Sequence, residues 1–279
     1  MRNTSQESLM TLAQRAKNKG DYQQSNQYLE EALRMGHDTQ IVLMMCDNYL
    51  KLRQSDQAYF LIKEESDLFS NASIWKCYLE ILQTNHFEIE IKQLAHLRQK
   101  TIPLGFEPLS ETAQSQIMKN FRQKNIIQER DYLKLYKLTL KSFVHFTQSL
   151  LLDPSQDFAL RLTLCEDLVK LGIKTKTKVF VLGESTSFVP ANTELLAYNS
   201  LYREIISSLG DRYFHEPSKL PEILAEANLI LGSLYPKLSE YIDEPDGFAS
   251  DFNHYLVTRN GRSHHDLLEK IYRHLPTGY

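Results

Sequence analysis

Three stretches in the N-terminal third of the chain share one pattern of apolar and polar positions. In each stretch, apolar residues recur at i, i+3, i+4 and i+7, which predicts a helix that buries one face. Successive stretches are offset by 33 residues, and the matching apolar positions are Leu9, Leu12, Ala13 and Ala16, then Val42, Met45, Cys46 and Tyr49, then Trp75, Tyr78, Leu79 and Leu82. A constant interval of this length indicates a repeated structural unit.

A second helix follows the first in each unit and keeps the same interval. Its apolar or small positions in register are Ser25, Ala58 and Ile91, and also Leu29, Ile62 and Ala95. Gly20 lies between the two helices of the first unit, where a sharp helix end favours a residue that tolerates left-handed backbone. Arg53 and His86 stand at the corresponding positions of the next two units. Each unit is therefore predicted to be a helix–turn–helix.

This organisation resembles the tetratricopeptide repeat, a helical hairpin of about 34 residues. The resemblance covers roughly residues 6–103 and is best in the first unit, at Leu9, Leu12, Ala13, Gly20, Tyr22, Leu29 and Ala32. The second and third units depart from the family pattern at the turn glycine and at the last small position, which Glu65 and Arg98 occupy. The alternative is an unrelated bundle of α-helices.

The resemblance implies that the first helices line the concave side of the array. The residues that it places there are Met10, Gln14, Asn18, Met44, Asp47, Lys51, Lys76, Glu80 and Gln83. Amides, methionines and charges of both signs suit an extended peptide or protein segment. Asp47 would repel a carboxylate, so the terminal-carboxylate clamp of chaperone-docking repeats is not expected. The alternative is that these residues form ordinary solvated helix faces.

The second half of the chain loses the 33-residue interval after Pro103. Helical patterns recur over residues 111–128, 131–152, 155–172, 191–209, 217–236, 245–259 and 263–274. Residues 176–190 instead carry β-branched and aromatic residues on both sides of Gly183, which predicts a β-hairpin with strands within about 178–189. We predict a mainly α protein, with a repeat array at 1–103 and a helical C-terminal domain with one small β-hairpin at 104–279.

A second resemblance concerns residues 155–245, which include "DLVKLGI", "VFVLGESTSFVP" and "LLAYNSLYREIISSLGD". These segments are similar to the C-terminal region of cytoplasmic tetratricopeptide proteins from Gram-positive bacteria. The match is poorest from Asp246 onward. The resemblance implies an adaptor-like protein to which no catalytic activity is assigned.

Composition and charge narrow the classes of partner. Lys and Arg total 32 against 35 Asp and Glu, a net charge of −3 that gives no basic surface for nucleic acid. No apolar run approaches the ~18 residues of a membrane span, and the N-terminus lacks the apolar core of a signal peptide. Cys46, Cys77 and Cys165 are far apart in the sequence, which is typical of reduced thiols. We therefore expect a cytoplasmic protein that binds neither nucleic acid nor membrane.

No motif in the sequence predicts an enzyme or a cofactor. Glycine-rich nucleotide loops and nucleophile elbows are missing. The segment "SHHDLLEKIYRH" holds several potential metal ligands but lacks the HExxH order, so it is interpreted as a charged terminal helix without metal. We expect a non-enzymatic adaptor that binds a protein or peptide on the concave face of its repeats.

Two alternatives remain at the level of the sequence. A peptide-sensing regulator is disfavoured because the array begins near residue 6, which leaves no room for a preceding DNA-binding domain. An enzyme of unrecognised type in the C-terminal domain would have to lack every motif considered above.

Overall fold

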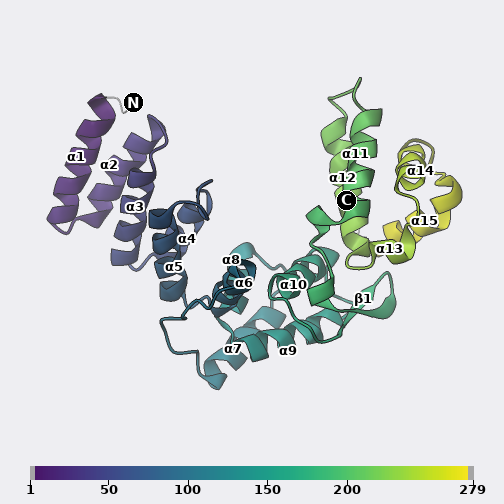
Figure 1. Ribbon diagram of the computed structural model, residues 1–279, viewed down its shortest axis with the longest axis horizontal. Coiled ribbons are helices and arrows are strands. Elements are labelled where there is room, and N and C mark those ends of the chain that lie inside the picture. The colour runs from purple at the N-terminus through teal and green to yellow at the C-terminus, as the bar shows by residue number, and fades with distance from the viewer. Residues whose placement is uncertain (1–3, 276–279) are drawn as a thin grey trace. The chain divides into compact units, whose positions relative to one another are not determined.

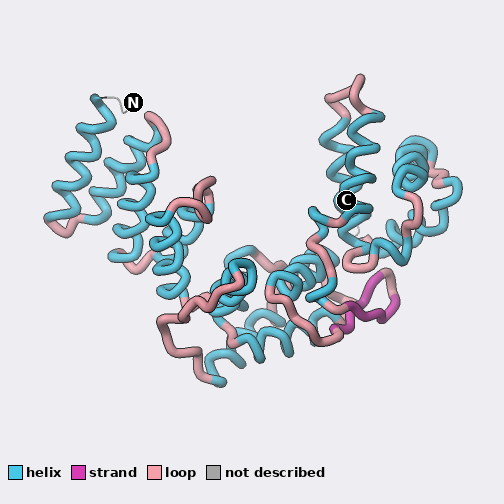
Figure 2. The backbone as a smooth tube through the Cα atoms, viewed as in Figure 1, coloured by secondary structure: helices cyan, strands magenta, loops and turns pink. Residues whose placement is uncertain are grey.

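The computed structural model describes residues 4–275 and is mainly α-helical with one two-stranded sheet (Figures 1 and 2). This confirms the predicted fold class. Backbone contacts divide the chain into two compact units, Met1–Ala95 with Thr101–Leu140, and His96–Lys100 with Lys141–Tyr279. The boundary predicted after residue 103 therefore falls inside the first unit, because residues 104–140 pack with the helical pairs.

Three helical pairs open the first unit. They are α1 (Thr4–Asn18) with α2 (Tyr22–Arg34), α3 (Thr39–Lys51) with α4 (Ser55–Lys63), and α5 (Ala72–Asn85) with α6 (Glu88–Arg98). Each of α1 to α4 packs on the next helix in chain order, and α3 also packs directly on α5 (Figure 1). The first helices therefore lie next to one another, as the 33-residue interval predicts.

The predicted inner faces of the first helices are buried at seven of twelve positions, half-buried at Leu9, Tyr49, Trp75 and Leu79, and exposed at Leu12. Ala13, Met45 and Tyr78 are at most 3% exposed, whereas Leu12 is 40% exposed. Met45 stands 33 residues after Leu12 and packs into a cluster with Ala13 and Leu29 of the preceding pair. Leu12 has no such cover, because no described helix precedes α1.

The turn inside each pair has one conformation, although only the first carries glycine. Gly20, Arg53 and His86 have φ values of 81°, 58° and 59°, all in the left-handed region. The amide that follows each of them donates to a carbonyl five residues earlier, at 3.0, 2.8 and 2.9 Å. This hydrogen bond defines the Schellman helix end. The repeat therefore continues in backbone geometry at two turns where the glycine is lost.

Glycine at position 53 is expected to stabilise the first unit. The Arg53 side chain is exposed, and left-handed backbone costs a residue with a Cβ about 1 kcal/mol. Arg53→Gly should raise the free energy of unfolding in urea by about that amount. Gly20→Ala is the matched control: no atom lies within 4 Å of the added Cβ, so it should lower stability through backbone strain alone. An unchanged or lower stability of Arg53→Gly would contradict this account.

The third pair is covered by the chain that follows it. Ile102, Leu104 and Phe106 pack against the core cluster that contains Tyr78 and Leu82. The next elements are α7 (Glu111–Arg122), α8 (Glu129–Tyr132) and the 3-10 helix η1 (Leu133–Lys137), whose Leu133 and Tyr136 join the same cluster. This packing explains why α6 is buried on more sides than α2 or α4.

The helix predicted over 131–152 is wrong, because it is interrupted before α9 (Leu140–Leu151). The backbone is extended at Leu138. The side-chain oxygen of Gln114, a residue that is 4% exposed, accepts from the amide of Thr139 at 3.1 Å and from its hydroxyl at 3.0 Å. The amide of Thr139 is therefore held by α7, which ends one helix and lets α9 begin.

A buried carboxylate ties α4, α5 and α6 together. Glu90 is 5% exposed and accepts from the Tyr59 hydroxyl and the Lys63 ammonium group, each at 2.9 Å. The Tyr78 hydroxyl also donates to Glu90. Burial and the negative charge of Glu90 raise the pKa of Tyr78, so its hydroxyl stays protonated as a donor. Three helices therefore share one acceptor.

The second unit is helical apart from its hairpin. After α9, its elements are α10 (Phe158–Lys170), β1 (Thr177–Val181), β2 (Glu184–Phe188), η2 (Pro190–Asn192), η3 (Leu196–Tyr198), α11 (Ser200–Arg212), α12 (Leu220–Leu234), α13 (Leu238–Tyr241), α14 (Pro245–Thr258), η4 (Arg262–His264) and α15 (His265–His274). Strands β1 and β2 pair antiparallel, with Val181 opposite Glu184, so Leu182 and Gly183 form the turn. The predicted hairpin is confirmed.

Two boundaries in this unit differ from the sequence prediction. The helix expected over 191–209 starts only at Ser200, because residues 190–198 form two short 3-10 turns. It then continues through Gly210 to Arg212, beyond the predicted end at residue 209. Gly210 is half-buried, and no atom lies within 4 Å of the position of a Cβ there. Gly210 therefore marks no turn.

Candidate functional site

The predicted binding residues lie on the first helices, and we call the surface that they form the first-helix face. Its exposed members are Gln14, Asn18, Lys51, Lys76 and Glu80, and its half-buried members are Met10, Met44, Asp47 and Gln83. Lys51 and Lys76 have no ion-pair partner among residues 4–275, so both ammonium groups are directed to solvent. The surface combines accessible charge with half-buried methionine.

Contacts join α1 to α3 across this face. The Lys17 ammonium group lies 2.6 Å from a carboxylate oxygen of Asp47, and their side chains are 24% and 42% exposed. Within α1, the Gln14 amide nitrogen donates to the Asn18 side-chain oxygen at 2.9 Å. Lys17 was not among the predicted residues. No pattern in the sequence marks it, because Leu50 stands one repeat later and its partner is found only in the folded array.

The methionines form the apolar part of the face. Met10 and Met44 pack, half-buried, against a core cluster that includes Ala13, Leu29 and Ile41. A thioether adapts to differently shaped apolar neighbours because its bonds rotate easily and its sulfur is polarisable. An apolar side chain of a partner would therefore find contact here without a preformed pocket.

The thiols of Cys46 in α3 and Cys77 in α5 lie in the core beside the charged residues. Cys46 is fully buried and Cys77 is half-buried, and both pack in the cluster around Tyr78. Interaction with the Cys46 thiol lowers the pKa of Cys77, while burial and the carboxylates of Glu80 and Asp47 act in the opposite direction. Interaction with the Cys77 thiol and burial raise the pKa of Cys46. Asp47 and Glu80 therefore both lie close enough to Cys77 to influence its charge.

The protein's own chain occupies one end of the face. The Gln83 amide nitrogen donates to the Pro103 carbonyl oxygen at 3.4 Å. A Cβ on Gly105 would lie 2.6 Å from that nitrogen, so the loop passes directly over the Gln83 side chain. The protein's own loop therefore engages one of the predicted binding residues, Gln83.

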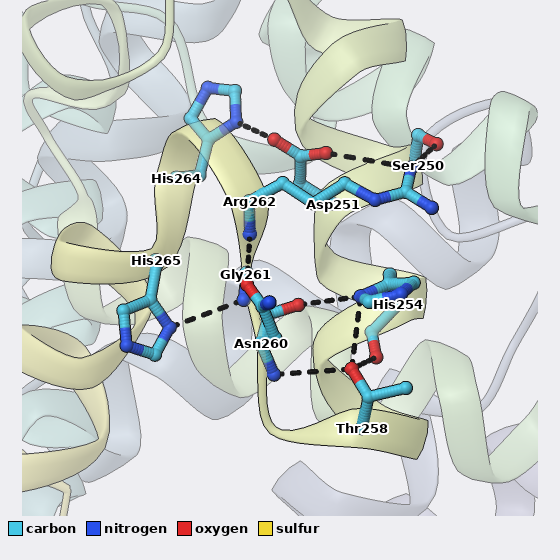
Figure 3. A network of polar contacts seen from close by, with 9 residues as sticks. All are labelled: Ser250, Asp251, His254, Thr258, Asn260, Gly261, Arg262, His264 and His265. Carbon is cyan, nitrogen blue, oxygen red and sulfur yellow. Dashed lines mark hydrogen bonds and ion pairs between the residues drawn. The ribbon is translucent and has the colours of Figure 1, made fainter.

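A second polar cluster closes the turn between α14 and α15 (Figure 3). The buried Asp251 carboxylate lies 2.8 Å from Nδ1 of His264 and 4.0 Å from the Arg262 guanidinium. His254 uses Nδ1 toward the Asn260 carbonyl oxygen at 2.7 Å. His265 Nδ1 accepts from the backbone amide of Gly261 at 3.2 Å. Each ring therefore holds a different part of one turn.

This cluster does not assemble a catalytic triad or a metal site. The Ser250 hydroxyl oxygen accepts from the Arg262 guanidinium at 3.5 Å, whereas His264 contacts Asp251. Figure 3 shows the three imidazole rings directed toward separate groups. Among the residues that the structure describes, no group of three or more His, Cys, Asp or Glu side chains could hold a metal ion. The arrangement fits a structural role.

Comparisons with known proteins add nothing to the geometry of the candidate site. No protein-family model, curated protein or solved structure matches the chain. Within residues 4–275, none of the helices combines the length and the apolar character that a membrane span requires.

Proposed function

We propose that the first unit is a protein-interaction platform that holds an extended segment of another protein against the first-helix face. The observation that carries this proposal is the continuity of the face over α1, α3 and α5. Lys17 of α1 pairs with Asp47 of α3. The Cys77 thiol of α5 lies near the carboxylates of Asp47 on α3 and Glu80 on α5. An extended segment crossing these helices would meet apolar and charged groups in turn.

The charges of the face favour a segment that carries acidic side chains. Asp47 is already paired with Lys17, whereas Lys51 and Lys76 are exposed on neighbouring helices. Acidic side chains of the partner would complement these two ammonium groups, and an apolar side chain would pack on Met10 and Met44. Exposed ion pairs are weak and screened by salt, so binding should weaken as ionic strength rises.

In this proposal the chain is a tetratricopeptide-like protein, and the repeated turns support that assignment. The left-handed residues at 20, 53 and 86 keep the interval that the sequence shows. The proposal therefore retains the role implied by the resemblance, a non-enzymatic cytoplasmic adaptor.

Simultaneous replacement of Lys51 and Lys76 by alanine is expected to weaken partner capture. Proteins retained by the tagged wild-type chain in its native cytoplasm would be identified by mass spectrometry, and the bound segment then made as a synthetic peptide. The affinity of this peptide for the double variant should fall by about tenfold or more, because the two ammonium groups that complement its acidic side chains are removed.

The matched control replaces Lys174 and Lys176, which are exposed in the second unit, by alanine. This variant loses the same charges and should bind the peptide like the wild type. Circular dichroism would show that both variants keep their helices. Equal binding by both variants, or equal loss in both, would contradict the first-helix face as the binding surface.

A further inference from the structure

The turn between α14 and α15 contains an asparagine that is followed by glycine, Asn260–Gly261. No other asparagine in the sequence precedes a glycine. Glycine has no side chain to shield its amide nitrogen from the carboxamide carbon of the preceding asparagine. Asn260 is exposed, whereas Gly261 is buried. Water therefore reaches the carboxamide, while the fold holds the neighbouring nitrogen.

Two hydrogen bonds of this turn suit a reaction between these two groups (Figure 3). The Gly261 amide donates to Nδ1 of His265 at 3.2 Å, which is within the reach of a general base. The Asn260 side-chain oxygen accepts from the Arg262 amide at 2.9 Å, a distance at which a donor stabilises a developing oxyanion. The nitrogen therefore has a proton acceptor, and the carboxamide oxygen has a donor.

The backbone on both sides of Asn260 is also held. Its amide donates to the Thr258 hydroxyl at 3.2 Å, and its carbonyl oxygen lies 2.7 Å from Nδ1 of His254. A fixed arrangement of a nucleophile and its electrophile lowers the entropic cost of their reaction. The turn thus presents the nitrogen, the carboxamide, the proton acceptor and the oxyanion donor together.

We propose that the turn converts Asn260 into isoaspartate and aspartate, with the Gly261 nitrogen as nucleophile and the His265 imidazole as base. This modification site lies in the second unit, so it does not depend on the proposed function of the first-helix face.

The reaction needs only water as a second reactant. The Gly261 nitrogen bonds to the side-chain carbonyl carbon of Asn260 and passes its proton to Nδ1 of His265. The bond between that carbon and Nδ2 then breaks, and the imidazolium returns the proton to the departing nitrogen, which leaves as ammonia. Water opens the resulting cyclic imide. Opening at the side-chain carbonyl gives aspartate, opening at the main-chain carbonyl gives isoaspartate, and no group is oxidised or reduced.

Isoaspartate is expected to loosen this turn. It lengthens the main chain by a methylene group beside Gly261, where an added Cβ would lie 2.7 Å from the Cα of His265. Arg259 and Arg262 on either side have φ values of 58° and 47°, in the left-handed region that is unfavourable for residues with a Cβ. Contacts within the turn therefore hold its shape, and the modified chain should unfold at a lower temperature than the unmodified chain.

The test incubates the full chain at neutral pH in ¹⁸O-labelled water and follows Asn260 by peptide mapping with mass spectrometry. Digestion in unlabelled water separates this reaction from changes during handling. Asn260 should be converted about tenfold or more faster in the folded chain than in the same chain unfolded in urea, because only the folded chain holds the base and the oxyanion donor in place. Conversion in the folded chain that is equal to or slower than in urea would overturn the proposal.

His265→Asn tests the base while the turn is kept. The asparagine oxygen can accept the Gly261 hydrogen bond but does not take up the proton, so conversion should slow by about tenfold or more. His264→Ala is the control, because the His264 imidazole contacts Asp251 and should leave conversion at the wild-type rate. Circular dichroism would show that both variants are folded. Unchanged conversion in folded His265→Asn, or an equal loss in His264→Ala, would show that the His265 imidazole is not the base.

Discussion

Replacing Glu90 by alanine is expected to lower the free energy of unfolding of the first unit by about 3 kcal/mol. The Tyr59 and Tyr78 hydroxyls would lose their carboxylate acceptor inside a core that admits little water. A buried donor without its acceptor costs about 1–3 kcal/mol, and two hydroxyls are affected here. Lys63 adds less to the loss, because its side chain is 41% exposed and can be solvated.

Glu90→Gln is the control that separates hydrogen bonding from charge. The glutamine oxygen still accepts a hydrogen bond, whereas its amide nitrogen can only donate. The loss should therefore be smaller than for Glu90→Ala. Urea denaturation followed by far-ultraviolet circular dichroism would measure both variants. A change below about 1 kcal/mol for Glu90→Ala would show that the carboxylate does not organise this core.

Replacing Gly261 by alanine is expected to destabilise the second unit by about 2–3 kcal/mol. Gly261 is buried in the turn between α14 and α15, and its amide donates to His265. An added Cβ would lie 2.7 Å from the backbone Cα of His265 and 2.8 Å from a methyl carbon of Leu268. Since one obstacle is backbone, relief requires α15 to shift, which would strain the contacts of Figure 3.

Gly210→Ala, in the same unit, is expected to change stability in the opposite direction. Gly210 lies within α11 with open space around the Cβ position, so alanine should raise stability by about 0.5–1 kcal/mol. Thermal unfolding of the two variants would give a melting temperature below the wild type for Gly261→Ala and above it for Gly210→Ala. The same sign for both would contradict the packing described for these glycines.

These two glycines show where sequence reasoning stops. Gly210 stands between the helical patterns predicted over 191–209 and 217–236, and Gly261 between those over 245–259 and 263–274, so both are predicted to lie outside helices. The structure confirms this at Gly261 and contradicts it at Gly210, which continues α11. A glycine lowers helical propensity only modestly, so tertiary packing can carry a helix through it.

The predicted binding residues show the same limit of sequence reasoning. The sequence placed Met10 to Gln83 on three first helices, because the 33-residue interval fixes which positions share a register. It did not predict that Lys17 meets Asp47 or that the loop at Gly105 lies over Gln83. Those contacts depend on how α1, α3 and α5 are spaced, which no single helix encodes.

The sequence by itself determined the helical character of the chain, the interval of the three pairs and the β-hairpin around Gly183. Helical and strand periodicity report which face of each element is apolar, and this information is local. Tertiary structure alone decided the break before α9, where Gln114 takes the amide of Thr139, and the gathering of Tyr59 and Tyr78 on Glu90. Polar groups in a core find partners that are distant in the sequence, so only the packed chain reveals which side chains meet.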